Sequence, residues 1–140
     1  MAQGRPYQAY QTTSIKTSSQ KQLIVMLYDG MQRFTGKAIQ SIHEKDYENA
    51  HQNLNRTGKI LLELLSTLRE DKGGEIAANL KKIYVHCYEQ IVIANLKKDI
   101  QMIKDVQIVL GNLSEGWKQM AKKDSRPQME SAPQQIRITG

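Results

Sequence analysis

The sequence predicts an all-α protein, an antiparallel four-helix bundle. Apolar residues recur every three or four positions through four long segments, which is the period of a helix buried on one face. Short polar or glycine-containing breaks separate the segments, and no run alternates with the two-residue period of a strand. Helices of about 20 residues joined by short turns pack as antiparallel neighbours. A chain of 140 residues suits one such domain.

The first helix is expected to begin near Ser19 or Gln20. Ser19 and Gln22 form a capping-box pattern, which satisfies backbone N–H groups at a helix start. The apolar stripe that follows consists of Ile24, Leu27, Met31, Phe34, Ala38 and Ile42. Residues 1–16 hold too few apolar side chains for an amphipathic helix. We therefore expect residues 1–18 to form a flexible N-terminal arm with two aromatic anchors, Tyr7 and Tyr10.

The second helix is expected to run from Asp46 to about Arg69. Asp46 is a suitable N-cap because its carboxylate can accept a hydrogen bond from a backbone N–H in the first turn. A heptad stripe follows it, consisting of Tyr47, His51, Leu54, Gly58, Leu61, Leu65 and Leu68. The helix should end before the turn at residues 71–74, where Gly73 and Gly74 accept positive φ angles.

The third helix is expected to open near Glu75 and to be the most buried of the four. It carries two neighbouring apolar stripes, one with Ile76, Leu80, Ile83, Cys87, Ile91 and Ala94, the other with Ala77, Tyr84, Tyr88 and Val92. Residues 97–99 are a polar break, which predicts a tight turn or a kink. A fourth helix then reaches Met120. We place the bundle at residues 19–121 and expect the polar, proline-containing residues 122–140 to be disordered.

Composition favours a protein of the reducing cytosol. The single cysteine, Cys87, has no partner for an intrachain disulfide, and the first twenty residues lack the apolar segment of a secretory signal. The longest aliphatic run, Leu23 to Leu27, is far too short to cross a bilayer, so no direct membrane insertion is expected. The net charge of +6 is spread along the chain, which favours a solubilising basic surface over a nucleic-acid site.

The residues that could carry chemistry do not form a known constellation. Glu48 and His51 make one Glu-x-x-His unit, whereas a di-iron site in a helical bundle needs two. Cys87 follows His86, and neighbours on a helix point about 100° apart, so this histidine is badly placed to deprotonate the thiol. Gly58 and Lys59 lack the rest of a phosphate-binding loop. We therefore expect a protein that is not an enzyme, with no catalytic residues, metal or cofactor.

Two other function classes are weighed against a binding module. A nucleic-acid regulator would bind with an affinity that falls steeply with salt, but these helices are long and their lysines lie on several faces. A helical enzyme would need a cluster of perturbed ionisable groups in a pocket. The sequence has only three histidines, and they are scattered along the chain. An excess of apolar residues on the first and third helices indicates either a wide buried face in a central helix, which accounts for most of it, or a groove that accepts amphipathic helices from a partner.

Residues 18–30, Ser-Ser-Gln-Lys-Gln-Leu-Ile-Val-Met-Leu-Tyr-Asp-Gly, resemble the first-helix signature of the flagellar export chaperone family FliS. The resemblance continues in order over about residues 7–120, through Arg33 and Phe34, Asp46, residues 50–68, residues 73–80, Tyr84, Ala94, Asn95 and Trp117. Two departures are Gln20 and Lys21, where the family usually has Pro and Glu. The positive net charge of the chain also differs from the charge that is usual in the family, so the charge that a partner should carry stays open.

The resemblance implies a cytoplasmic chaperone of the bacterial cytosol. Its client is the disordered C-terminal region of flagellin, which it keeps from premature polymerisation and delivers to the flagellar type III export gate. A monomer with one client is expected. Matched positions and leftover helix faces assign flagellin contact to Ile24, Tyr28, Leu80, Tyr84, Ile91 and Asn95. Tyr7 and Tyr10 match the family's N-terminal arm, which implies a role in docking to an export-gate component.

Overall fold

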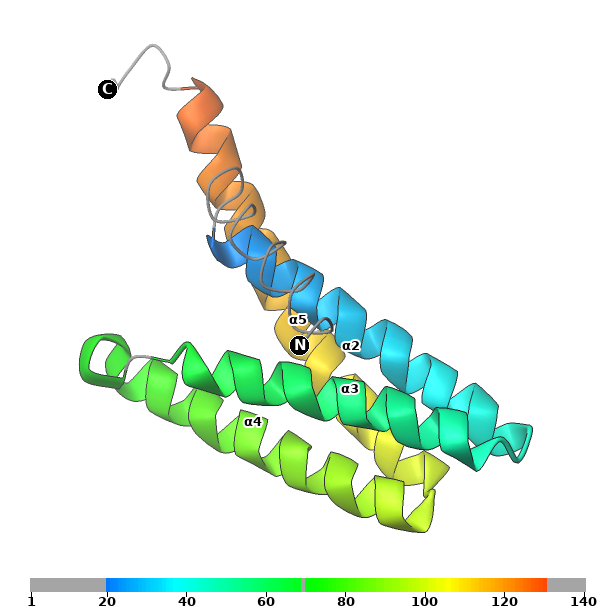
Figure 1. Cartoon of the computed structure of the whole chain (residues 1–140). Coiled ribbons are helices and arrows are strands. Elements are labelled where there is room, and N and C mark those ends of the chain that lie inside the picture. The colour runs from blue at the N-terminus through cyan, green and yellow to red at the C-terminus, as the bar shows by residue number, and fades with distance from the viewer. Residues whose placement is uncertain (1–19, 69, 131–140) are drawn as a thin grey trace, which may run out of the picture. The chain divides into compact units, whose positions relative to one another are not determined.

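A computed structural model of the chain describes residues 20–68 and 70–130, and these residues form four helices without a strand. The helices are α2 (Gln20–His43), α3 (Tyr47–Ser66), α4 (Glu70–Lys97) and α5 (Ile100–Glu130), shown in Figure 1. The prediction of an all-α fold with four helices is confirmed. The N-terminal arm, with Tyr7 and Tyr10, lies outside the described residues, and the division into arm, bundle domain and tail stays a prediction.

The chain divides into two compact units, and the boundary between them passes through two helices. One unit spans Tyr28–Gly111 and holds most of α2, all of α3 and α4, and the first part of α5. The other contains, among the described residues, the first turns of α2 and the later turns of α5. Everything that follows on packing and on the candidate site concerns the unit 28–111.

The corner between α2 and α3 is a short turn that the sequence predicts well. Lys45 adopts φ 61°, and the N–H of Asp46 donates to the carbonyl of Ser41 at 2.8 Å, which closes the end of α2. The Asp46 carboxylate accepts hydrogen bonds from the backbone N–H and the side-chain amide of Asn49, at 3.2 and 2.9 Å. Asp46 is therefore the N-cap of α3, as expected.

The buried face of α3 differs from the predicted heptad stripe. Leu54, Gly58 and Leu61 are buried as expected, but Tyr47 and His51 are exposed. Asn53 and Thr57 are buried in their place. Both satisfy their donors within the helix, because the Asn53 amide donates to the carbonyl of Asn49 at 2.8 Å and the Thr57 hydroxyl to the carbonyl of Asn53 at 3.1 Å. The helix also ends at Ser66, earlier than predicted.

The turn predicted at residues 71–74 is a kink inside α4, where two helical stretches meet at Gly74. Helical geometry starts at Glu70, and Gly74 interrupts it with φ 58° and ψ −133°. A residue with a Cβ is strained at that φ, which explains the glycine. At Gly73 a Cβ would lie 2.6 Å from the Cβ of Ala77, so the kink also requires a residue without a side chain there. The predicted start near Glu75 coincides with the helix beyond the kink.

Lys98 adopts φ 54° between α4 and α5, so the predicted break at residues 97–99 is a tight turn. The N–H of Asp99 donates to the carbonyl of Ala94 at 3.0 Å, and the Asp99 carboxylate accepts from the N–H of Met102 at 3.1 Å, which caps α5. α5 continues past Met120 to Glu130, so the first part of the tail expected at residues 122–140 is helical.

The core of the unit 28–111 is apolar with a few internally bonded polar groups. Its fully buried side chains come from all four helices and include Met31, Leu54, Leu61, Leu64, Tyr84, Ile91, Ile103 and Leu110. Burying each large apolar side chain contributes about 1.5–3 kcal/mol. Gln32 and Gln107 join α2 to α5, because the Gln32 amide donates to the carbonyl of Gln107 and the Gln107 amide to the Thr35 hydroxyl, both at 3.0 Å.

Candidate functional site

A groove of about 600 Å³ lies between α3 and α4, the two helices drawn side by side in Figure 1. Both helices belong to the unit 28–111 and pack against each other in opposite directions. The residues that line the groove are His51, Leu54, Asn55, Gly58, Lys59 and Leu62 from α3, and Tyr88, Ile91, Val92, Asn95, Leu96 and Lys98 from α4 and the turn after it.

The floor of the groove is built where α3 lacks a side chain. A Cβ at Gly58 would lie 3.3 Å from Cε1 of Tyr88, so the glycine lets the tyrosine ring approach the α3 backbone closely. Leu54 and Ile91 complete the floor, and both are almost fully buried, at 0% and 2% exposure. Each therefore anchors the pair of helices while presenting its edge to the groove.

The walls of the groove are apolar and exposed. Leu62 on α3 is 47% exposed, and Val92 and Leu96 on α4 are 42% and 81% exposed. The prediction that α4 is the most buried helix is wrong, because Ile76, Val85 and Ile93 add to its exposed apolar surface. Each of the two predicted stripes of α4 has buried and exposed members, because Ile91 and Tyr84 are buried whereas Ile76 and Val92 are exposed.

A chain of polar groups closes one end of the groove. The Asn55 amide lies 3.1 Å from Nε2 of His51, and Nδ1 of His51 lies 3.3 Å from Oδ1 of Asn95. With these partners, Nε2 accepts and the Nδ1–H donates. Lys98 completes the chain by donating from Nζ to Oδ1 and to the backbone carbonyl of Asn95, at 3.0 and 2.6 Å.

Two of the predicted client contacts, Ile91 and Asn95, line this groove. Leu80 lies on α4 outside the groove lining and is half-buried. Ile24 is buried and belongs to the other unit.

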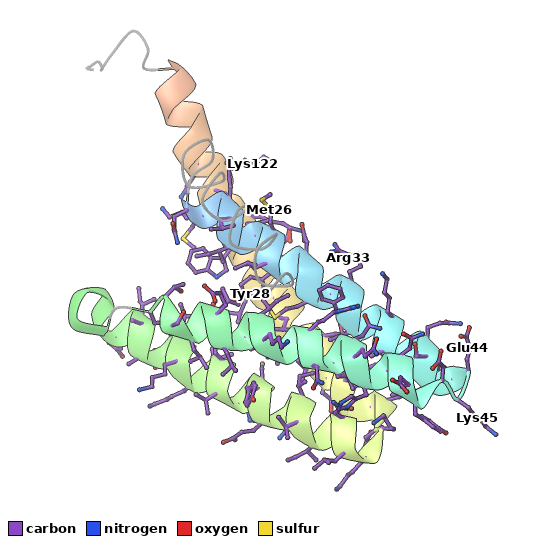
Figure 2. All side chains as sticks on the ribbon, viewed as in Figure 1. Met26, Tyr28, Arg33, Glu44, Lys45 and Lys122 are labelled. Carbon is purple, nitrogen blue, oxygen red and sulfur yellow. The ribbon has the colours of Figure 1, made fainter. Side chains whose placement is uncertain are left out.

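Tyr28 and Tyr84 are core residues in this structure. They are 0% and 1% exposed, their hydroxyls lie 2.6 Å apart, and the ring centroids are 6.4 Å apart. Tyr28 lies on α2 (Figure 2) and Tyr84 on α4, so the pair connects two helices that are distant in the sequence. The hydrogen bond between the two hydroxyls gives each buried oxygen a partner inside the protein.

Reasoning from stripes missed five residues of the groove, which are Asn55, Lys59, Leu62, Leu96 and Lys98. Leu62 and Leu96 fall off the stripes that define the core faces of their helices, and large apolar residues off the main stripe are the signal that marks an additional apolar surface. No sequence pattern identifies Lys59, because an exposed lysine on a helix is ordinary. Its place at the groove depends on the pairing of α3 with α4.

Within residues 20–68 and 70–130, no three His, Cys, Asp or Glu side chains come together in a way that could hold a metal ion. Cys87 is fully buried, and burial raises the pKa of its thiol to about 11, which keeps it protonated at neutral pH. None of the described helices is both long and apolar enough to cross a membrane.

Comparison with known proteins gives a consistent result. The family model described as flagellar protein FliS matches residues 1–124. The flagellar secretion chaperone FliS of Bacillus subtilis is 32% identical over 126 residues, covering 90% of this chain and 93% of the relative. The proteins of the same name from Campylobacter jejuni and Salmonella typhimurium are each 33% identical, covering 85% and 81% of this chain and 93% and 84% of their own lengths.

Proposed function

Because the chain belongs to the FliS family of flagellar secretion chaperones, we propose that it is a cytoplasmic export chaperone for flagellin. It binds the disordered C-terminal region of flagellin, prevents premature polymerisation and delivers the client to the flagellar type III export gate. The observation that carries this proposal is the apolar groove between α3 and α4, with Leu62, Val92 and Leu96 exposed along its walls.

The physical chemistry of the groove suits a client that folds on binding. A disordered segment loses conformational entropy when it becomes helical, and burial of its apolar face against exposed leucine and valine side chains offsets that loss. An amphipathic helix presents such a face at spacings of three and four residues. Exposed apolar side chains spread along two helices give a divided contact without one deep anchor, so the client remains releasable.

The residues assigned to flagellin contact fall into two groups, those that line the groove and those that do not. Ile91 and Asn95 contact the client directly in this proposal, since both line the groove. The assignment of Leu80, Tyr84 and Tyr28 stays a prediction, and the two buried tyrosines would reach a client only if the helices around them moved apart. The roles of Ile24, and of Tyr7 and Tyr10 in docking to the export gate, also stay predictions.

Calorimetric titration of a peptide from the C-terminal region of the same organism's flagellin tests the proposal. We expect saturable binding of one peptide per protein, with a negative heat-capacity change because apolar surface is buried. Val92→Asp should weaken this binding at least tenfold, because it places a carboxylate in the apolar wall. Ile108→Asp is the matched control, since Ile108 is 63% exposed on α5 and does not line the groove.

Absence of binding by the unmodified protein at both low and high salt would overturn the proposal. Equal weakening by the two aspartate variants would show that the groove is not the binding site. The same titration, combined with light scattering of the free protein, tests the expectation of a monomer with one client. Affinity that collapses with salt would instead favour nucleic acid as the partner.

A further inference from the structure

We propose that two lysines at the rim, Lys59 and Lys98, make the groove selective for amphipathic helices whose apolar stripe is flanked by Asp or Glu side chains. This inference rests on the proposed function, because it assumes that the α3–α4 groove binds the client. It adds the charge pattern that the client must carry, a property that an apolar groove alone does not specify.

The charges around the groove have one sign. The charged residues of the lining are Lys59 and Lys98, which are both cationic, and the lining contains no Asp or Glu. Glu48, Glu63 and Glu89 on the same two helices, and Asp99 beside Lys98, are not part of the lining. A helix that lies in the groove therefore contacts two cationic side chains of the lining and no carboxylate of the lining. An acidic flank is attracted there, and a basic flank is repelled.

Lys98 is held in position before a partner arrives. Its backbone adopts φ 54° at the end of α4, and its ammonium donates two hydrogen bonds to Asn95, one to the backbone carbonyl and one to the side chain. An ammonium has three donors, so one remains for an incoming carboxylate. Because the side chain is already ordered, a new ion pair there costs less rotamer entropy than one with a mobile lysine.

Lys59 supplies the second charge from α3. It is exposed, lines the groove beside Gly58, and has no hydrogen bond or ion pair to another residue in the described part of the chain. The two lysines thus come from α3 and from the turn that follows α4. A bound helix with carboxylates along both edges of its apolar stripe can meet both, whereas a helix with one acidic edge meets only one.

The expected effect is selectivity rather than high affinity. An exposed ion pair strengthens an association about two- to fivefold, and two such pairs together give about tenfold. Replacing the carboxylates by lysines converts attraction into repulsion and increases the difference further. The preference should shrink as salt screens the rim charges, while the apolar contribution persists.

Three designed helical peptides test this inference. All share one apolar stripe, and the flanking positions carry Glu, Gln or Lys. At low salt we expect the Glu peptide to bind about tenfold more tightly than the Gln peptide, and the Lys peptide to bind most weakly. At high salt the three affinities should converge. Fluorescence anisotropy of labelled peptides measures the dissociation constants.

Charge reversal in the protein separates the rim from the overall charge. Lys59→Glu should remove most of the preference for the Glu peptide over the Gln peptide, measured as the ratio of their dissociation constants. Lys104→Glu is the matched control, because Lys104 is exposed on α5, lies outside the groove lining, and undergoes the same change in net charge. Its preference should remain that of the unmodified protein.

The outcomes distinguish this inference from the proposed function. If the three peptides bind alike while Val92→Asp still weakens flagellin binding at least tenfold, the chaperone proposal stands and the charge selectivity is refuted. Equal effects of Lys59→Glu and Lys104→Glu would also refute it, because net charge alone would then account for the preference. It fails equally if none of the designed peptides binds to a protein that binds the flagellin peptide.

Discussion

The buried pair of Tyr28 and Tyr84 gives a direct test of whether these residues serve the core or the client. The perturbation is the set Tyr28→Phe, Tyr84→Phe and the double variant. Each single change removes one hydroxyl from a pair whose oxygens lie 2.6 Å apart and leaves the other hydroxyl inside the protein. The rings remain, so the apolar packing between α2 and α4 is preserved.

The expected loss of unfolding free energy follows from the burial of Tyr28 and Tyr84. A net hydrogen bond contributes about 0.5–1.5 kcal/mol, and a buried hydroxyl that loses its partner adds a desolvation penalty. Each of the two tyrosines also has a further interaction, which limits this penalty. We therefore expect each single variant to lose about 1–2 kcal/mol of unfolding free energy. The double variant should lose about 1 kcal/mol less than the sum, because both members of the pair are then apolar. For 140 residues, 1 kcal/mol corresponds to a fall in Tm of about 3–4 °C.

Urea unfolding followed by circular dichroism measures the four free energies, and titration with the flagellin peptide measures binding. Tyr47→Phe is the matched control, since Tyr47 is 50% exposed and its variant should change stability by less than about 0.5 kcal/mol. We expect client affinity to stay within about twofold in all variants. Unchanged stability together with weakened client binding would refute the core assignment. Additive losses would refute the direct coupling of the two hydroxyls.

Three further predictions concern single positions. Leu96→Ala should weaken client binding by about 1.5–2 kcal/mol in titration while leaving stability nearly unchanged, because Leu96 is 81% exposed. Ile91→Ala, at a buried position, should instead lower the unfolding free energy by about 2–5 kcal/mol. The opposite pattern would contradict the described groove. Burial raises the pKa of Cys87 from its usual 9.0 to about 11, so the folded state keeps a proton that the unfolded state releases; this stabilisation is complete below pH 9 and declines as the pH rises to 11. The stability advantage over Cys87→Ala, measured by urea unfolding, should therefore shrink by up to about 3 kcal/mol across that range, and a constant difference would refute the shift. Gly74→Ala should lower the unfolding free energy by about 1–3 kcal/mol, because residue 74 has a φ of 58°. Gly36→Ala has open space around the new Cβ and should raise the unfolding free energy by about 0.5–1 kcal/mol in the same assay. Equal effects of the two variants would contradict the kink.

Local patterns in the sequence determine where the helices of this protein begin and end. The carboxylate of Asp46 caps α3, Gly74 marks the kink before the main part of α4, and the polar residues 97–99 form the turn before α5. Each of these features depends on interactions within a few residues, so the amino-acid order is sufficient to find it. The end of α5 is less predictable, because the polar composition after Met120 favours disorder and yet the helix continues to Glu130.

Periodicity predicts the buried face of each helix less well than local patterns predict where the helix begins and ends. Several apolar stripes compete on α4, and Asn53 and Thr57 take buried places on α3 because carbonyls of their own helix accept their hydrogen bonds. The sequence pattern does predict an apolar surplus and, through the family resemblance, Ile91 and Asn95. It does not reveal that Tyr28 is internal, since an aromatic residue beside a stripe can face either the core or a partner.

The groove itself is a product of tertiary structure. Gly58 and Tyr88 are neighbours only because α3 and α4 pack side by side, and the same pairing brings Lys59 and Lys98 to the same groove. Helix formation depends on contacts between residues three or four apart, so the chain order encodes it directly. Which side chains remain exposed depends on contacts between residues tens of positions apart, and only the packed helices decide those.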